Sequence, residues 1–193
     1  LKKYQKIHIV ACGSAYHVGG VGTYVIEKLT RIPVEVDVAS EFRYRDPIVD
    51  DKSLVIVISQ SGETADTLAA LKEAKSRGAR ILSIVNVVGS AIANASDDVI
   101  YTWAGPEIAV ATTKAYSTQL SVIYLIALYM AEKLGKIDDK EYSEIIEEIQ
   151  KLPEKITKIL EYKDDIQYFA SKFFSSKSIF FIGRNLDYAV ALE

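Results

Sequence analysis

The sequence predicts an α/β fold, a three-layer sandwich in which helices cover both faces of a parallel five-stranded sheet. Short runs of β-branched residues alternate with segments whose apolar residues recur at helical spacing. This alternation is typical of parallel strands joined by right-handed helical crossovers. With 193 residues, 49% of them hydrophobic and 25% charged, the chain can bury the core of such a domain.

The first two thirds of the chain supply the elements of this sheet. We expect strands at 6–13, 34–39, 54–58, 80–85 and 99–103. Helices are expected at 16–29, 40–44, 64–77 and 115–134, with a brief helical turn between the last two strands. Glu35 and Asp37 alternate with valines, which predicts that the strand at 34–39 has one exposed face and lies near the sheet edge.

The chain divides into three parts by pattern. Residues 1–137 are expected to form the main domain. Residues 138–177 carry many charges and no strand pattern, which indicates a helical connector. The run K-S-I-F-F-I-G at 177–183 is similar to K-I-H-I-V-A-C-G at 6–13, and a helix-compatible segment follows it. We therefore expect residues 178–193 to be the truncated beginning of a second repeat. The chain opens on Leu1, so we expect it to be part of a longer protein.

Composition excludes several classes of function. A net charge of −3 gives no basic surface for nucleic acid or for an anionic membrane. The apolar segment at 115–131 is interrupted by polar residues and is too short to span a membrane. The single cysteine, Cys12, excludes an intrachain disulfide framework and favours a cytoplasmic protein. His8 and His17 have no ligand residue at metal-binding spacing, so no metal or other cofactor is expected.

The candidate functional site is the stretch L-V-I-V-I-S-Q-S-G-E-T at 54–64. Ser59, Gln60, Ser61 and Thr64 follow a buried strand and precede a helix, at the end of the sheet where α/β proteins bind ligands. Hydroxyls, free N–H groups and a helix N-terminus suit a phosphate monoester, and Gly62 would let the backbone approach it. The lysine motif of nucleotide-binding loops is missing, which favours a small phosphorylated metabolite. Alternatively, the hydroxyls only cap the helix.

Five blocks of sequence together resemble the isomerase region of the glutamine–fructose-6-phosphate aminotransferase family. They are A-C-G at 11–13, A-S-E-F-R-Y-R at 39–45, S-Q-S-G-E-T at 59–64, E-I-A-V-A-T-T-K-A at 107–115 and D-Y-A-V-A-L-E at 187–193. The third block alone indicates only a sugar isomerase (SIS) domain, which has a flavodoxin-like fold, and the others select the family. The chain looks like the first SIS subdomain, the connector and the start of the second.

The resemblance implies a site for fructose 6-phosphate or glucosamine 6-phosphate. It implies that the phosphate is bound by Ser59, Gln60, Ser61 and Thr64, and the sugar by Gly13, Ser14, Val110 and Thr112. It also implies that Glu193 is the catalytic base that moves a proton between the first two sugar carbons. Family members commonly read C-G-T-S where this chain has C-G-S-A, so no role is transferred to Ala15.

The implied activity of the parent protein is the aminotransfer and isomerisation that begin amino sugar synthesis on the way to UDP-N-acetylglucosamine. The resemblance also implies a glutaminase domain in the full-length protein. The helix at 115–134 is rich enough in aliphatic side chains to pack against a partner, so we expect a homodimer. Because the glutaminase domain and other parts of that machinery are missing from this sequence, we expect binding without full turnover. The alternatives are a non-catalytic sugar-phosphate sensor of a regulator and a ketose-phosphate isomerase without amidotransfer.

Overall fold

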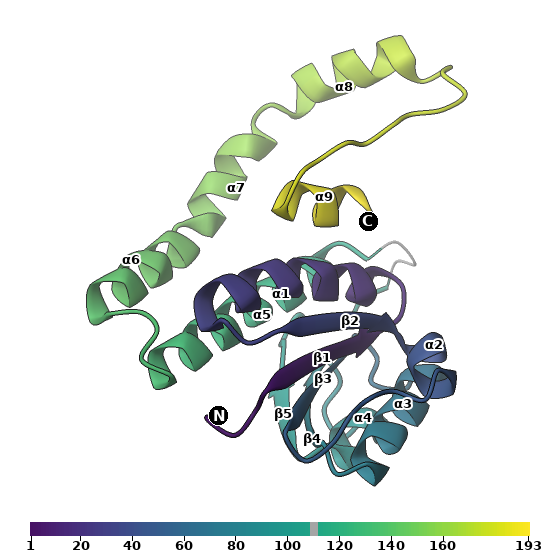
Figure 1. Cartoon of the computed structure of the whole chain (residues 1–193). Coiled ribbons are helices and arrows are strands. Elements are labelled where there is room, and N and C mark those ends of the chain that lie inside the picture. Colours follow the sequence, from purple (N-terminus) through teal and green to yellow (C-terminus); the bar gives the residue numbers. More distant parts are fainter. Residues whose placement is uncertain (109–111) are drawn as a thin grey trace.

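A computed structural model, which describes residues 1–108 and 112–193, contains the predicted parallel sheet. The strand order is β2-β1-β3-β4-β5 (Figure 1). The strands are β1 (Lys6–Ala11), β2 (Val34–Val38), β3 (Ser53–Ser59), β4 (Arg80–Val85) and β5 (Asp98–Tyr101). The edge position of β2 agrees with the alternation of Glu35 and Asp37 with valines.

Helices cover both faces of the sheet, so the predicted three-layer sandwich is confirmed. The helices α1 (Ser14–Thr30) and α5 (Lys114–Lys133) pack in one hydrophobic cluster with β1, β3 and β4. The helices α2 (Ala39–Tyr44), α3 (Ala65–Ser76) and α4 (Ala91–Ala95) belong to the cluster on the opposite face. The chain passes from the carboxyl end of β1 into α1, and from the carboxyl end of β3 into α3. These two connections form the candidate site.

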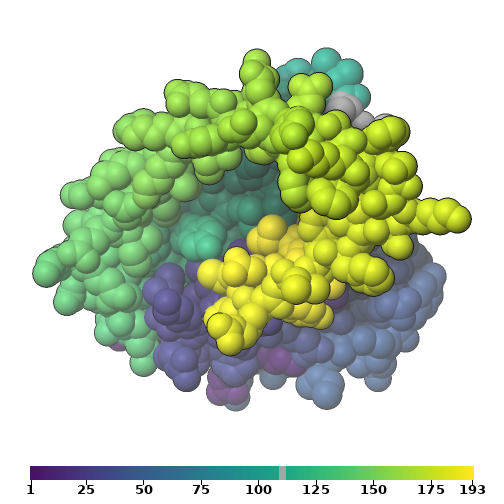
Figure 2. All heavy atoms as spheres, turned by 90° about the horizontal axis from the view of Figure 1, so that it is seen from above, coloured from purple at the N-terminus to yellow at the C-terminus, as the bar shows by residue number. Residues whose placement is uncertain are grey.

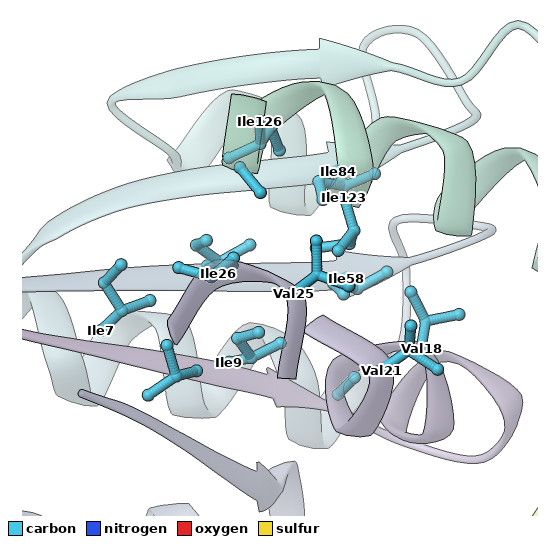
Figure 3. Packing of buried hydrophobic residues seen from close by; sticks show 14 of the residues in the cluster. Ile7, Ile9, Val18, Val21, Val25, Ile26, Ile58, Ile84, Ile123 and Ile126 are labelled. Atoms are coloured by element: carbon cyan, nitrogen blue, oxygen red, sulfur yellow. The ribbon is translucent and has the colours of Figure 1, made fainter. Parts of the chain in front are cut away.

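The helix α1 lies unusually close to the sheet. Figure 3 shows Ile7 and Ile9 of β1 beside Val25 and Ile26 of α1. A Cβ atom at Gly19 would lie 2.7 Å from Val36 Cγ2 and 2.9 Å from Ile9 Cγ2. Only a glycine lets the helix backbone approach β1 and β2 this closely, so the glycine fixes the height of α1 above the sheet.

The C-terminal third of the chain is an arm of helices. The helices α6 (Asp139–Gln150), α7 (Leu152–Leu160) and α8 (Lys163–Phe173) run away from α5, and α9 (Leu186–Ala191) returns to lie against α1. Figure 2 shows this arm arching from the green α6 region to the yellow C-terminal segment. Asp138 caps α6 by accepting the Glu141 N–H at 2.8 Å. Among the described residues, no helix combines the length and apolarity that crossing a bilayer requires.

The stretch after α8 differs from the pattern that its sequence suggested. Within the described chain, the β-rich run after Lys177 forms no strand and pairs with none of the five strands. The side chains of its apolar residues are 68–93% exposed: Ile179, Phe180, Phe181 and Ile182. A strand is stable only when neighbouring strands satisfy its backbone groups, and this run has no such neighbour. The assignment of residues 178–193 to a second repeat stays a prediction.

Candidate functional site

The turn between β3 and α3 brings the predicted phosphate-binding residues together. Ser59 Oγ accepts the Gly62 N–H at 3.0 Å and lies 3.1 Å from Thr64 Oγ1. Ser61 Oγ accepts the Glu63 N–H at 3.2 Å. Thr64 occupies the N-cap position of α3, yet among the described residues its hydroxyl bonds Ser59 and makes no capping bond. The capping alternative therefore does not account for Thr64.

Gly62 is required by the turn itself. Its φ of +68° lies in the left-handed region, and a Cβ atom there would lie 2.0 Å from Ser90 Oγ. The Gly62 carbonyl accepts the Ile92 N–H at 2.9 Å, so the turn is held against the start of α4. The sequence predicted that this glycine serves a close approach to a ligand, whereas the observed close approach is to Ser90.

A pocket of about 300 Å³ opens at this turn. It lies between the carboxyl ends of β1 and β3 and the first turns of α1, α3 and α5. Its lining residues are Cys12, Gly13, Ser14, Ala15, Ile58, Ser59, Gln60, Ser61, Thr64, Thr67, Thr112 and Gln119. All the residues predicted for the phosphate and the sugar are in this set except Val110, which lies outside the described residues.

Thr67 and Gln119 line the pocket with hydrogen-bonding side chains that were not predicted from the sequence. The side chain of Thr67 is fully buried, and its hydroxyl donates to Cys12 Sγ at 3.7 Å. Gln119 is only 2% exposed, although it carries a polar amide on the apolar helix α5. The signal for Gln119 was present as one of the polar interruptions of the segment at 115–131. The signal for Thr67 was its position three residues after Thr64, which places both on one helix face.

The pocket offers hydrogen-bond donors without a formal charge. In the described part of the chain, its lining contains hydroxyl, amide, thiol and apolar side chains and no ionised one. Both α1 and α3 begin at the pocket, and their first N–H groups have no partner within the helix. The positive ends of two helices, together with Ser and Thr hydroxyls, can bind an anionic oxygen group.

The predicted base, Glu193, is not among the described residues that line the pocket. Glu193 Oε2 is 3.9 Å from His17 Nε2, so the carboxylate reaches the first turns of α1. Burial raises the pKa of Tyr116 on α5, and the negative charge of Glu193 raises it further. The end of α9 therefore brings Glu193 close to α1 and α5, two of the three helices whose first turns border the pocket.

The sequence model of the SIS domain matches residues 1–129. The chain belongs to the SIS domain family. Over all 193 residues, this SIS chain is 62% identical to the glutamine–fructose-6-phosphate aminotransferase (isomerizing) of Caldanaerobacter subterraneus subsp. tengcongensis. It is 60% identical over 193 residues to the enzyme of that name from Clostridium tetani. The chain spans 32% of the length of each of these relatives.

A solved structure has the same fold as this SIS chain. The C-terminal domain of glucosamine-fructose-6-phosphate aminotransferase from Francisella tularensis superposes with a TM-score of 0.95 and is 38% identical in sequence. The match covers 98% of this chain and 54% of that one. The comparisons confirm the SIS fold and the resemblance to the aminotransferase family that the five sequence blocks indicated.

Proposed function

We propose that this chain is the sugar-phosphate-binding part of the isomerase region of a glutamine–fructose-6-phosphate aminotransferase, and that its pocket binds fructose 6-phosphate or glucosamine 6-phosphate. The observation that carries this proposal is the pocket at the ends of β1 and β3, where hydroxyls and two helix N-termini converge. The identities of 62% and 60% to enzymes of this name support it.

In this proposal the β3–α3 turn binds the phosphate. Ser59 is 4% exposed and its oxygen already accepts a backbone N–H, so its main role is to hold the turn in shape. The partly exposed groups of Gln60, Ser61 and Thr64 then donate to the phosphate oxygens together with the first N–H groups of α3. Several donors to one anionic group give charge-assisted hydrogen bonds, which are stronger than neutral ones.

The sugar would extend from the turn towards β1 and α5. Gly13, Ser14 and Thr112 line that side of the pocket, and the buried amide of Gln119 adds a group that can bond a sugar hydroxyl. Val110 remains part of the proposed sugar contacts by resemblance alone. These neutral groups can orient the sugar carbons but cannot remove a proton from carbon.

We propose Glu193 as the base for the proton transfer between the first two sugar carbons. Glu193 Oε2 lies 3.9 Å from Nε2 of His17 on α1, a helix that begins at the pocket, and this supports the proposal. In the full-length parent enzyme, Glu193→Gln is expected to lower the isomerisation rate about 100-fold or more while leaving fructose 6-phosphate affinity within about threefold. Single-turnover kinetics measure the rate and equilibrium titration measures the affinity. An unchanged rate would remove Glu193 from the mechanism.

The remaining proposals concern the parent protein. We propose that it carries a glutaminase domain, acts in the cytoplasm in amino sugar synthesis and forms a homodimer. Leu125 and Tyr129 of α5 are 44% and 54% exposed, which provides apolar surface for a second copy. Sedimentation equilibrium of this chain measures its oligomeric state, and a monomer at all concentrations would oppose a dimer formed through α5.

The substrate proposal is tested by titration calorimetry of the chain with fructose 6-phosphate, fructose and inorganic phosphate. Fructose is expected to bind at least about 100-fold more weakly than fructose 6-phosphate, since each charge-assisted hydrogen bond to the phosphate contributes roughly 1.5–3 kcal/mol. Inorganic phosphate should compete with fructose 6-phosphate. Equal affinities for fructose and fructose 6-phosphate would contradict the assignment of the β3–α3 turn to the phosphate.

A further inference from the structure

A second group of polar side chains lies at the β2 edge of the sheet and shares no residue with the pocket. His8 of β1 is in register with Glu35 of β2, and Val10 is in register with Asp37. Since side chains two residues apart on a strand point to the same face, His8, Glu35 and Asp37 gather on one face of two neighbouring strands. One ligand atom from each of the three lies within 4.8 Å of the others.

The imidazole of His8 is buried without a hydrogen-bond partner. Its residue is 0% exposed, and neither Nδ1 nor Nε2 finds a partner among the described residues. Nδ1 lies 4.0 Å from Asp37 Oδ2, so it faces the carboxylates. A buried polar nitrogen without a hydrogen-bond partner lowers the stability of the folded protein. The unpartnered imidazole of His8 therefore points to a ligand that would bind its free electron pair.

The two carboxylates already hold cationic groups. Arg45 Nη2 lies 2.5 Å from Glu35 Oε1 and 2.6 Å from Asp37 Oδ2. Lys6 bonds the other oxygen of Glu35. The side chain of Arg45 is 39% exposed, so it can swing into solvent and leave one oxygen of each carboxylate free.

We propose that His8, Glu35 and Asp37 bind a divalent transition metal ion such as Zn²⁺, and that Arg45 competes with the metal for the two carboxylates. One imidazole nitrogen and two carboxylate oxygens form a ligand set that Zn²⁺ accepts. Metal–ligand bonds of about 2.1 Å require ligand atoms roughly 3.4 Å apart in a tetrahedral site. Changes of the Asp37 and Glu35 side-chain rotamers can supply the contraction, including that of the 4.0 Å between His8 Nδ1 and Asp37 Oδ2.

The chemistry of the ligands selects the class of metal. Mg²⁺ and Ca²⁺ prefer oxygen ligands alone, whereas an imidazole suits zinc, cobalt and nickel ions. The fourth position would be open to water. The metal replaces one guanidinium between the carboxylates and gives His8 a partner that no residue in the described parts of the chain provides. The site is independent of the proposed sugar-phosphate function, and either proposal can fail without the other.

The test is calorimetric titration of the chain with Zn²⁺ and with Mg²⁺, and absorption spectroscopy with Co²⁺ as a reporter. One Zn²⁺ ion is expected to bind per chain, with Mg²⁺ giving no heat and Co²⁺ giving the visible bands of a low-coordinate site. Asp37→Asn and His8→Gln are expected to weaken Zn²⁺ binding at least tenfold. Circular dichroism confirms that each variant is folded before titration.

The decisive variant is Arg45→Gln, which removes the competing cation and keeps all three ligands. It is expected to strengthen Zn²⁺ binding about tenfold or more, in a variant that circular dichroism first shows to be folded. Arg43→Gln is the matched control, because Arg43 lies on α2 and pairs instead with Asp66 at 3.6 Å. No Zn²⁺ binding, binding unaffected by His8→Gln, or equal affinities of the Arg45 and Arg43 variants would overturn the proposal.

Discussion

Gly62→Ala is expected to destabilise the protein by about 2–4 kcal/mol and to abolish measurable binding of fructose 6-phosphate. Alanine at φ +68° costs about 1 kcal/mol in backbone strain. The new methyl group would also lie 2.0 Å from Ser90 Oγ and 2.5 Å from Ser90 Cβ, and relieving such an overlap typically costs 1–3 kcal/mol. The turn must move away from α4, so its hydroxyls and N–H groups no longer converge.

Urea denaturation measures the loss of stability caused by Gly62→Ala. Ser90→Gly provides the matched background, because it removes Oγ and Cβ of Ser90, the two atoms that the methyl group would overlap. In that background, Gly62→Ala is expected to cost only about 1 kcal/mol, the part that belongs to the backbone conformation. Calorimetric titration of the Gly62→Ala variant and of the Gly62→Ala/Ser90→Gly double variant then shows whether Ser90→Gly restores binding of fructose 6-phosphate. If Gly62→Ala lowers the free energy of unfolding equally in both backgrounds, the contact with Ser90 is not the reason that this position requires glycine.

Ser61→Asp is expected to weaken fructose 6-phosphate binding about 100-fold with little loss of stability. A carboxylate about 4 Å from the phosphate would interact with each phosphate charge by roughly 4 kcal/mol at an effective dielectric constant of 20, and the partial exposure of Ser61 reduces this value. The lining contains, in the part of the chain that the structure describes, no cation that could neutralise the new charge. The repulsion should decrease with added salt.

Ser61→Asn is the control, since it has nearly the same size as aspartate but no charge. We expect it to weaken binding less than about tenfold, with little dependence on salt. Titration calorimetry at two salt concentrations separates the two variants. If asparagine and aspartate reduce the affinity equally, shape and not charge limits binding at this position, and the phosphate binds elsewhere.

The sheet was predictable because its signals are local. Each strand is a run of β-branched residues, and the polar alternation at Glu35 and Asp37 marks β2 as an edge strand. Ser59, Ser61 and Thr64 were predictable for the same reason, since they follow one strand directly. Connectivity alone then places the start of α1, with Gly13 and Ser14, at the same end of the sheet.

The properties that depend on contacts across the chain were not predictable. Gln119 reaches the pocket from a helix that begins 55 residues after Ser59, and sequence spacing cannot relate them. The spacing argument against a metal at His8 considered neighbours in sequence, whereas Glu35 and Asp37 become its neighbours through strand pairing. The strand suggested after Lys177 is absent from the described sheet because pairing partners, and not the composition of the run, decide whether a strand forms.

The close contact of α1 with the sheet at Gly19 has a consequence for ligand recognition. The backbone of α1 at Gly19 packs directly on the side chains of Ile9 and Val36, so we expect the amide groups at its first turn to keep one orientation when a ligand binds. On the proposed function, we expect the free protein to hold these donors as the complex with the sugar phosphate would. Little conformational entropy is lost on association, and a small pocket of neutral groups can achieve useful affinity without a charged side chain.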